Sequence, residues 1–193
     1  MAQRIGIVGG TFDPIHIGHL ILAVQAREQL SLDRVLLIPN NQSPLKSNAP
    51  VASFADRLAM VECAVAGVDG IEASDIEGQR GGVSYMIDTL RGLDQTYPGA
   101  SFVLILGTDA LHDLPMWRES DAIRRHATIA AVARGGESID TTDRTLEVVS
   151  MPRVDISATE IRQRLNAGKS IDFLTPMSVI TYIRDKGLYG YRA

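Results

Sequence analysis

Short apolar runs alternate along this chain with longer segments in which apolar residues recur at helical spacing. The short runs predict strands at residues 4–8, 34–38, 70–74, 102–106, 128–132 and 146–149. The longer segments predict helices at about residues 18–30, 54–66, 85–97 and 116–125. This alternation is typical of βαβ units, whose right-handed crossovers place helices on both faces of a parallel sheet. We therefore predict an α/β fold with a doubly wound parallel sheet.

The end of the chain has a different, helical character. Ser157-Ala158-Thr159-Glu160 forms a capping-box pattern, which predicts a helix to about Ala167. Pro176 is expected at the first position of a last helix, which runs to about Lys186. No repeat or long linker divides the sequence. We predict one Rossmann-like domain over residues 1–193, whose part from about 157 to 188 is a small C-terminal helical segment.

Composition narrows the classes of partner. The chain has 193 residues, 45% of them hydrophobic, which is enough for the core of one domain. A net charge of −4 leaves no broad basic surface, so we expect no nucleic-acid partner. No apolar stretch approaches the ~20 residues that a bilayer requires, and no leader pattern is present, so we expect a cytoplasmic protein without a membrane partner. The lone Cys63 cannot form an internal disulfide. The sequence leaves open whether the chain forms a homo-oligomer.

The segment GGTFDPIHIGH, residues 9–19, lies between the first predicted strand and the first predicted helix. In a doubly wound fold this junction faces the ligand crevice. Gly9 and Gly10 let the backbone approach a phosphate closely, and the N–H groups of the following helix favour negative charge. His16 and His19 lie three residues apart, so both imidazoles can donate to the same anion. Either histidine alone favours a structural role, but the pair behind a glycine turn favours phosphate binding.

Other readings of this segment are weaker. Neither the Gly-x-x-x-x-Gly-Lys-Ser/Thr phosphate loop nor the Gly-x-Gly-x-x-Gly dinucleotide pattern is present. A zinc site formed by His16, His19 and Asp13 is an alternative, although no further His or Cys lies at ligand-like spacing.

A second group of polar residues lies at the start of the predicted C-terminal helix. Ser157 is the expected N-cap. Ser157, Thr159 and Arg162 can meet phosphate oxygens together, because hydroxyls, a guanidinium and free backbone N–H groups share the first turns of one helix. Arg162 by itself would more often be a solvated surface residue.

Both segments resemble signatures of one superfamily. GGTFDPIHIGH resembles the first signature of the nucleotidyltransferases with the (H/T)xGH motif, and residues 156–162, ISATEIR, resemble the second, ISSTxIR. The pair lies at opposite ends of the chain, so the resemblance covers nearly all of it. HIGH also occurs in class I aminoacyl-tRNA synthetases, but this chain is too short for one and lacks their Lys-rich signature.

Within that superfamily the chain is most similar to the bacterial nicotinate-nucleotide adenylyltransferases. The similarity rests on His16, on SYMIDTL at residues 84–90, and on GTD at residues 107–109 followed by Trp117. Two departures are Ala158, where a second Ser is usual, and SPLK at residues 43–46, where a PPHK-like sequence is common.

The resemblance implies transfer of AMP from ATP to nicotinate mononucleotide, giving nicotinate adenine dinucleotide and pyrophosphate in NAD biosynthesis. It implies catalytic roles for His16, His19 and Arg162 in stabilising charge. The implied ATP-binding residues are Gly9, Gly10, Thr11, Phe12, His16, His19, Gly107, Asp109, Ser157, Thr159 and Arg162. The implied mononucleotide-binding residues are Lys46, Ser84, Tyr85, Thr89, Trp117 and Arg134. We expect no metal-ligand residue, and we expect Mg²⁺ to be held mainly by ATP phosphates and water.

Several alternatives stay open. Asp109 can contact ribose hydroxyls or cap a short helix, and Trp117 can stack on a pyridine ring or belong to the core. The acceptor can instead be phosphopantetheine, or the enzyme a cytidylyltransferase, although those relatives often carry Thr-x-Gly-His and lack SYMIDTL and Trp117. A regulator that binds nucleotides without turnover is the alternative from another functional class.

Overall fold

The computed structural model describes residues 2–44, 49–135 and 145–191. One sheet of six strands forms its centre, in the order β3-β2-β1-β4-β5-β6, and every neighbouring pair is parallel. The strands are β1 (Arg4–Gly10), β2 (Arg34–Pro39), β3 (Ile71–Ala73), β4 (Ser101–Gly107), β5 (Ala127–Arg134) and β6 (Leu146–Met151). The predicted doubly wound α/β class is confirmed, and the strand order is that of a Rossmann fold.

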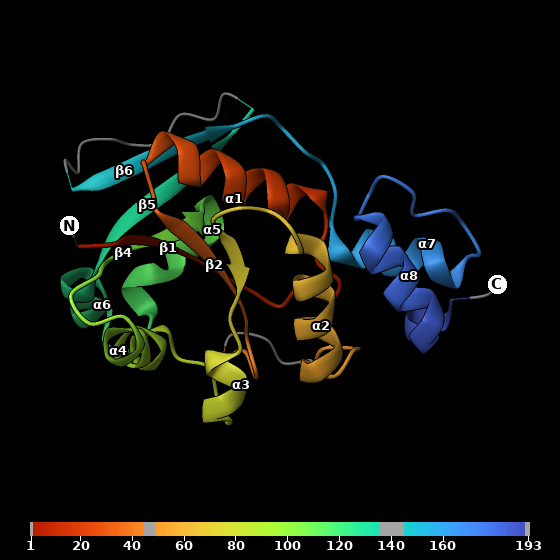
Figure 1. Ribbon diagram of the computed structural model, residues 1–193, viewed down its shortest axis with the longest axis horizontal. Helices are drawn as coiled ribbons and strands as arrows, with labels where there is room; N and C mark the ends of the chain where they lie inside the picture. Colours follow the sequence, from red (N-terminus) through yellow and green to blue (C-terminus); the bar gives the residue numbers. More distant parts are fainter. Residues whose placement is uncertain (1, 45–48, 136–144, 192–193) are drawn as a thin grey trace.

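Helices cover both faces of this sheet (Figure 1). One face carries α1 (Ile17–Gln29) and α2 (Phe54–Val65); the other carries α4 (Met86–Thr96) and α6 (Ser120–His126). The shorter helices are α3 (Ile76–Arg80), α5 (Thr108–Asp113) and the 3₁₀ turn η1 (Leu114–Met116). The C-terminal helices are α7 (Ala158–Asn166), α8 (Met177–Lys186) and the 3₁₀ turn η2 (Leu188–Gly190).

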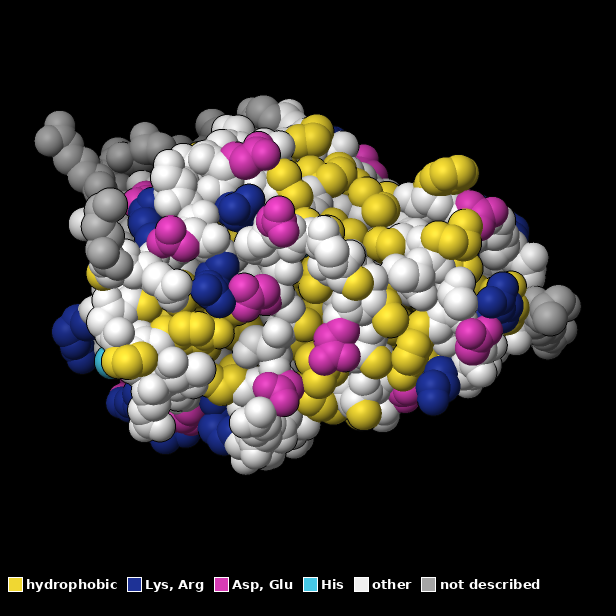
Figure 2. All heavy atoms as spheres, in the orientation of Figure 1, with side chains coloured by type: hydrophobic (Ala, Val, Ile, Leu, Met, Phe, Trp, Pro, Cys, Tyr) yellow, Lys and Arg dark blue, Asp and Glu magenta, His cyan; other side chains and the backbone are white. Residues whose placement is uncertain are grey.

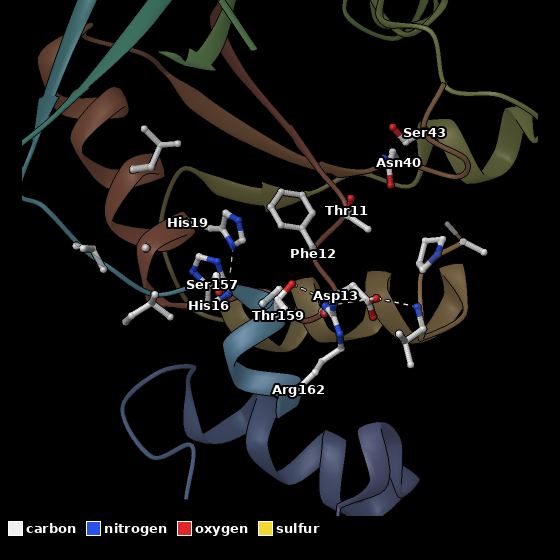
Figure 3. Close-up of a pocket in the computed structure, with 18 of the residues that line it drawn as sticks. Thr11, Phe12, Asp13, His16, His19, Asn40, Ser43, Ser157, Thr159 and Arg162 are labelled. Carbon is white, nitrogen blue, oxygen red and sulfur yellow. Dashed lines mark hydrogen bonds and ion pairs between the residues drawn. The ribbon is translucent and has the colours of Figure 1, made fainter. Parts of the chain in front are cut away.

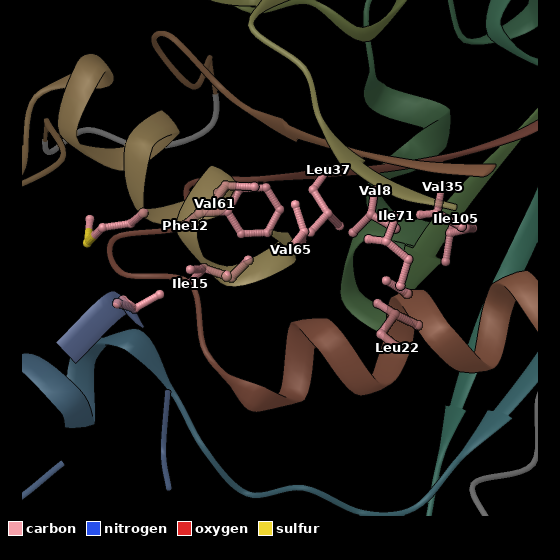
Figure 4. Close-up of a cluster of buried hydrophobic side chains, with 14 of the residues drawn as sticks. Val8, Phe12, Ile15, Leu22, Val35, Leu37, Val61, Val65, Ile71 and Ile105 are labelled. Atoms are coloured by element: carbon pink, nitrogen blue, oxygen red, sulfur yellow. The ribbon is translucent and has the colours of Figure 1, made fainter. Parts of the chain in front are cut away.

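The two cores arise from alternation along the strands. In β4, Val103 and Ile105 join the core beneath α1 and α2, while Leu104 joins the core beneath α4 and α6. This period of two is what a sheet buried on both faces requires. Figure 4 shows the first core, where Val8 and Leu37 of the sheet lie near side chains of α1 and α2.

The C-terminal helices lie beside α2 at one end of the molecule (Figure 1). The Ser178 hydroxyl of α8 donates to the carbonyl of Cys63 at 2.8 Å, and the Tyr182 hydroxyl donates to Asp56 Oδ1 at 3.0 Å. These contacts hold α8 against α2. As a result the first turn of α7 faces the first turn of α1 across the carboxyl end of the sheet.

Some predicted elements are corrected by the structure. The helix predicted at 116–125 is wrong in its first part: η1 ends at Met116 and α6 begins only at Ser120. Glu119 between them has φ of 53°, a left-handed conformation that interrupts a helix. The short helix α3 was not predicted, and α5 corresponds to the short helix that was one of the two readings of Asp109. Pro176 is the N-cap of α8 and not its first helical residue.

The surface mixes both signs of charge. On the face drawn in Figure 2, basic and acidic side chains are interspersed, and hydrophobic side chains gather over α2 and toward the C-terminal helices. Within the described residues, no helix is both long and apolar enough to cross a bilayer.

Candidate active site

The strand order reverses between β1 and β4, and in such folds ligands bind beyond the carboxyl ends of the strands at that point. A cavity of about 880 Å³ opens there. The loop after β1, the first turn of α1, the loop after β2 and the first turn of α7 line it. Its lining includes Thr11, Phe12, Asp13, His16, Gly18, His19, Asn40, Ser43, Ser157, Ala158, Thr159 and Arg162.

The two histidines form one unit at the start of α1. The backbone N–H of His16 donates to His19 Nδ1 at 3.2 Å, and the two rings stack with centroids 3.7 Å apart. Phe12 meets the His19 ring edge-on at 4.9 Å. Gly18 leaves room for this stack, because a Cβ there would lie 3.2 Å from the His16 ring. Since His19 Nδ1 accepts a hydrogen bond, the neutral ring carries its proton on Nε2 and can donate from there.

Polar side chains at the start of α7 line the same cavity (Figure 3). Ser157 is the N-cap of α7, as predicted, and its hydroxyl accepts from the backbone N–H of Glu160 at 3.1 Å. The Arg162 guanidinium donates through Nη1 to the carbonyl of Asp13 at 2.6 Å and through Nη2 to Thr159 Oγ1 at 3.2 Å. Arg162 is thus held in place by a residue 149 positions earlier in the chain.

Asp13 is buried, and its side chain ties the loop after β1 to other parts of the chain. Its carboxylate accepts from the backbone N–H groups of Val51 at 2.8 Å and Ala52 at 3.1 Å, and from the Tyr189 hydroxyl at 2.7 Å. Burial, together with the hydrogen bond to Asp13, raises the pKa of Tyr189 well above its ordinary value. Among the described residues, no group of three or more His, Cys, Asp or Glu side chains could hold a metal ion. Asp13, His16 and His19 therefore do not form the zinc site that their spacing allowed.

Arg57 of α2 supports two loops of the site, and the sequence analysis missed it. It is only 1% exposed, and its guanidinium donates to the carbonyls of Thr11 and Asn40, both at 2.8 Å. Burial lowers the pKa of Arg57, and the nearby Asp13 opposes this. Arg57 thereby fastens the loop after β1 to the loop after β2. The available signal was a charged residue three and four positions before the apolar Met60 and Val61, on the buried face of a helix.

A second cavity of about 390 Å³ lies beside the first and shares Thr11, Asn40 and Ser43 with it. Its lining also includes Gly9, Gly10, Ser84, Tyr85, Gly107 and Trp117. Ser84 is buried, and its hydroxyl accepts from the backbone N–H of Asn41 at 2.9 Å. Tyr85 is the N-cap of α4 and makes no side-chain cap, so the first N–H groups of α4 lack that partner. The buried Trp117 Nε1 has no hydrogen-bond partner among the described residues.

The sequence is similar to known proteins over nearly its whole length. The family model of the cytidylyltransferase-like proteins matches residues 7–164, which include both signatures. A probable nicotinate-nucleotide adenylyltransferase of Desulfatibacillum aliphaticivorans is 41% identical, over 97% of this chain and 100% of the relative. One of Roseiflexus sp. is 44% identical, over 96% of this chain and 97% of the relative. The chain belongs to the nicotinate-nucleotide adenylyltransferase family.

Solved structures support the fold. The chain superposes on Plasmodium falciparum nicotinic acid mononucleotide adenylyltransferase complexed with NaAD with a TM-score of 0.78, over 98% of both chains at 21% identity. A putative nicotinate-nucleotide adenylyltransferase of Vibrio parahaemolyticus gives a TM-score of 0.70 at 22% identity, over 97% of this chain and 95% of that chain. At these identities the likeness shows the shared fold.

The nicotinate-nucleotide adenylyltransferase pattern does not place every expected residue at a cavity. Thr89 is fully buried, and its hydroxyl donates to Glu77 Oε1 at 2.6 Å, so its prediction as a substrate contact is corrected: it braces α4 against α3. Asp109 is exposed on α5 and lines neither of the two cavities. It is not an N-cap either, because Gly107 holds that position.

Other expected residues have mixed positions. Lys46 lies outside the described residues, and Arg134 lies in β5 with its side chain outside them. Phe12 lines the larger cavity, but its side chain is 98% buried, so it belongs mainly to the hydrophobic core. Trp117 combines both earlier readings, because it packs partly against the second core and also lines the smaller cavity.

Proposed function

We propose that this chain transfers the adenylyl group of ATP to nicotinate mononucleotide, releasing pyrophosphate and forming nicotinate adenine dinucleotide in NAD biosynthesis. One observation carries the proposal: two cavities adjoin at the β1/β4 switch point and share Thr11, Asn40 and Ser43. Two substrates bound in them would meet at that shared wall. The names of relatives that are 41% and 44% identical over almost the full chain support the same reaction.

The larger cavity is the proposed site for ATP. His16 and His19 at the start of α1 and Ser157, Thr159 and Arg162 at the start of α7 line the same cavity, so a triphosphate bound there would receive donors from both helices (Figure 3). We assign the histidines to the α- and β-phosphates and the α7 residues to the β- and γ-phosphates. The first turn of α7 adds backbone N–H groups and the positive end of a helix dipole. Ala158 lines this cavity at the position where the family usually has Ser, so one hydroxyl is absent there.

The smaller cavity is the proposed site for the mononucleotide. Trp117 offers a ring on which the pyridine can stack, and Met86 at the first turn of α4 lines the same cavity. A carboxylate directed at that turn would be received by helix N–H groups that no side chain caps. Lys46 and Arg134 remain proposed partners of the mononucleotide phosphate, alongside Ser84 and Tyr85.

The reaction needs alignment more than proton transfer. An oxygen of the mononucleotide phosphate forms a bond to the α-phosphorus of ATP, and the bond from that phosphorus to the bridging oxygen of the β-phosphate breaks. The nucleophile is ionised at pH 7, so no general base is required. The protein has to hold two polyanions in line and stabilise charge on the α-phosphoryl group and the leaving pyrophosphate.

Magnesium fits this site only as a partner of the nucleotide. No described cluster of His, Cys, Asp or Glu could hold the ion, and the Asp13 carboxylate already accepts from Val51, Ala52 and Tyr189. Held by triphosphate and water oxygens, Mg²⁺ would neutralise part of the phosphate charge. The donors of the protein then act on the remaining oxygens.

We further propose that the enzyme acts in the cytoplasm.

The test measures pyrophosphate release from ATP and Mg²⁺ after addition of nicotinate mononucleotide, with phosphopantetheine as the alternative acceptor and CTP as the alternative donor. We expect turnover with ATP and nicotinate mononucleotide. Turnover only with phosphopantetheine would overturn the acceptor, and turnover only with CTP would overturn the donor. ATP binding without turnover on any acceptor would indicate a nucleotide-binding regulator.

A further inference from the structure

Tyr189 connects the 3₁₀ turn η2 to the loop after β1, which carries Asp13. It lies in η2, is only 7% exposed, and donates from its hydroxyl to Asp13 Oδ1 at 2.7 Å, across 176 positions of sequence. Burial keeps the phenol protonated, since it raises the pKa of Tyr189. The hydroxyl is therefore a permanent donor to this carboxylate.

Asp13 connects that hydroxyl to the cation of the ATP site. Its carbonyl receives Arg162 Nη1 at 2.6 Å, while its carboxylate Oδ2 lies 3.8 Å from the same nitrogen. The guanidinium thus has two neighbours on one residue: a neutral carbonyl that holds it at the cavity wall, and a buried negative charge that attracts it. How strongly the carboxylate attracts Arg162 depends on how well its own oxygens are satisfied by other donors.

From these contacts we propose that Tyr189 is a positioning residue for the ATP site: its hydroxyl satisfies the Asp13 carboxylate and so leaves the Arg162 guanidinium directed at the triphosphate. Without that hydroxyl, Oδ1 keeps only the Ala52 N–H, at 3.1 Å, among the hydrogen bonds described for it. A buried carboxylate that lacks a donor attracts a nearby cation more strongly, and Arg162 Nη1 lies 3.8 Å from the other oxygen of this carboxylate, Oδ2. ATP would then compete with Asp13 for the guanidinium. The inference rests on the proposed role of Arg162 in binding ATP.

The chain offers a matched control. Tyr182 also ties the C-terminal helices to the rest of the fold through its hydroxyl, which donates to Asp56 Oδ1 at 3.0 Å. Neither Tyr182 nor Asp56 lines the ATP cavity. Tyr182→Phe and Tyr189→Phe therefore remove the same group from the same C-terminal segment, but only the second removal reaches the Asp13–Arg162 pair.

The experiment measures the Kd of ATP–Mg²⁺ by calorimetry without any acceptor, together with the KM of each substrate and the Tm of each variant. For Tyr189→Phe we expect the Kd of ATP to rise about tenfold, the equivalent of one hydrogen bond to a charged group, while the KM of nicotinate mononucleotide stays within about twofold, a range too small to count as a lost contact. For Tyr182→Phe we expect at most a lower Tm. An unchanged Kd in a folded Tyr189→Phe protein, or equal loss of both substrates, overturns the proposal.

Two double variants test the route through Arg162. In an Arg162→Ala background, Tyr189→Phe should weaken ATP no further, and an additional tenfold loss would place its effect elsewhere. Adding Asp13→Asn to Tyr189→Phe removes the charge that draws Arg162 away, so the Kd of ATP should return toward that of the wild type. This double variant also carries the test if Tyr189→Phe alone fails to fold: a wild-type Kd supports the proposal and a weakened one overturns it. Because ATP binding is measured alone, failure of the wild type to use nicotinate mononucleotide would reject the proposed acceptor without deciding this test.

Discussion

The backbone N–H of His16 donates to Nδ1 of His19 across 3.2 Å, so one histidine of the signature sets the protonation of the other. A neutral His19 then has its N–H on Nε2, on the far side of the ring from this bond. The stack with His16, at 3.7 Å between centroids, keeps the ring from turning. A neutral His19 therefore acts as a donor of fixed direction through Nε2.

Replacement of His19 tests that donor. We expect His19→Ala to lower kcat by roughly 10²-fold, because a preorganised donor to developing charge is typically worth about 3 kcal/mol. His19→Gln should retain more activity than His19→Asn, since the amide nitrogen of Gln reaches the place of Nε2 and that of Asn the place of Nδ1. Steady-state pyrophosphate release measures both. His126→Ala, which removes a surface histidine paired with Asp94, is the control. Equal activity of the Gln and Asn variants would contradict the assigned tautomer.

Arg162 should act mainly on ATP. We expect Arg162→Ala to raise the KM of ATP by at least about tenfold and to leave the KM of nicotinate mononucleotide nearly unchanged. Arg162→Lys should restore only part, because an ammonium cannot reach the Asp13 carbonyl, Thr159 and a phosphate together as the guanidinium fork can. Arg164→Ala on the same helix is the control, since Arg164 donates to the Ser170 carbonyl and does not line the cavity. Equal weakening of both substrates would mean that Arg162 holds the fold.

Trp117 should act on the acceptor. We expect Trp117→Ala to raise the KM of nicotinate mononucleotide far more than that of ATP, with stacking worth about 1 kcal/mol beyond burial, and Trp117→Phe to keep part of it. The uncapped first turn of α4 also predicts that the acid mononucleotide is preferred to the amide, because N–H donors match a carboxylate better than an NH₂ group. Competition between the two mononucleotides measures the preference. Equal use of both would reject the carboxylate site and leave the stacking prediction standing.

The fold was predictable because it repeats simple patterns. Strands such as β4 are apolar on both faces and bounded by polar turns, so each of the six predicted strands overlaps an observed one. The errors fall where a single residue decides the backbone. Glu119 adopts a left-handed conformation that could not be predicted from its residue type, and this shifts the start of α6 to Ser120. A helix as short as α3 carries too few periodic positions to be recognised.

The site was predictable only where short motifs carried it. The residues of the two signatures lie far apart in sequence, yet Arg162 of the second contacts Asp13 of the first. Thr89 belonged to a motif but is buried against Glu77, because position in a motif does not distinguish a substrate contact from a residue that supports one. Arg57 and Tyr189 belong to neither signature. Their partners, the Thr11 and Asn40 carbonyls and the Asp13 carboxylate, are long-range contacts that no local pattern contains.

Arg57 should be a major determinant of stability. Its buried guanidinium donates to two loop carbonyls that would otherwise lack this donor, and it lies near the buried Asp13 charge. We expect Arg57→Met, which keeps the apolar stem, to lower the free energy of unfolding by about 2–4 kcal/mol. Urea denaturation measures this. A loss below about 0.5 kcal/mol, the range of ordinary surface substitutions, would show that the two loops are held together by other contacts.

Tyr189 also predicts how stability changes at high pH. Its pKa in the folded protein is raised above the ordinary value of 10.0, first by burial and then by the hydrogen bond to Asp13. Above about pH 10 the unfolded chain releases this proton while the folded chain keeps it, so the folded state binds more protons and stability falls as the pH rises. The stabilising effect is complete below pH 10 and is lost as the pH climbs toward the folded pKa.

The matching measurement is the free energy of unfolding in urea at several values of pH between 8 and 11. One retained proton corresponds to about 1.4 kcal/mol per pH unit, so between pH 10 and 11 the wild type should lose up to about that much more stability than Tyr189→Phe. Below pH 9 the difference between the two proteins should be constant. Tyr182, whose pKa is also raised by burial and by Asp56, still titrates in Tyr189→Phe, so a smaller alkaline loss should persist there and diminish in Tyr182→Phe/Tyr189→Phe. Parallel curves for wild type and Tyr189→Phe from pH 8 to 11 would contradict this prediction. They would mean that folding does not raise the pKa of the Tyr189 hydroxyl, despite its buried hydrogen bond to Asp13.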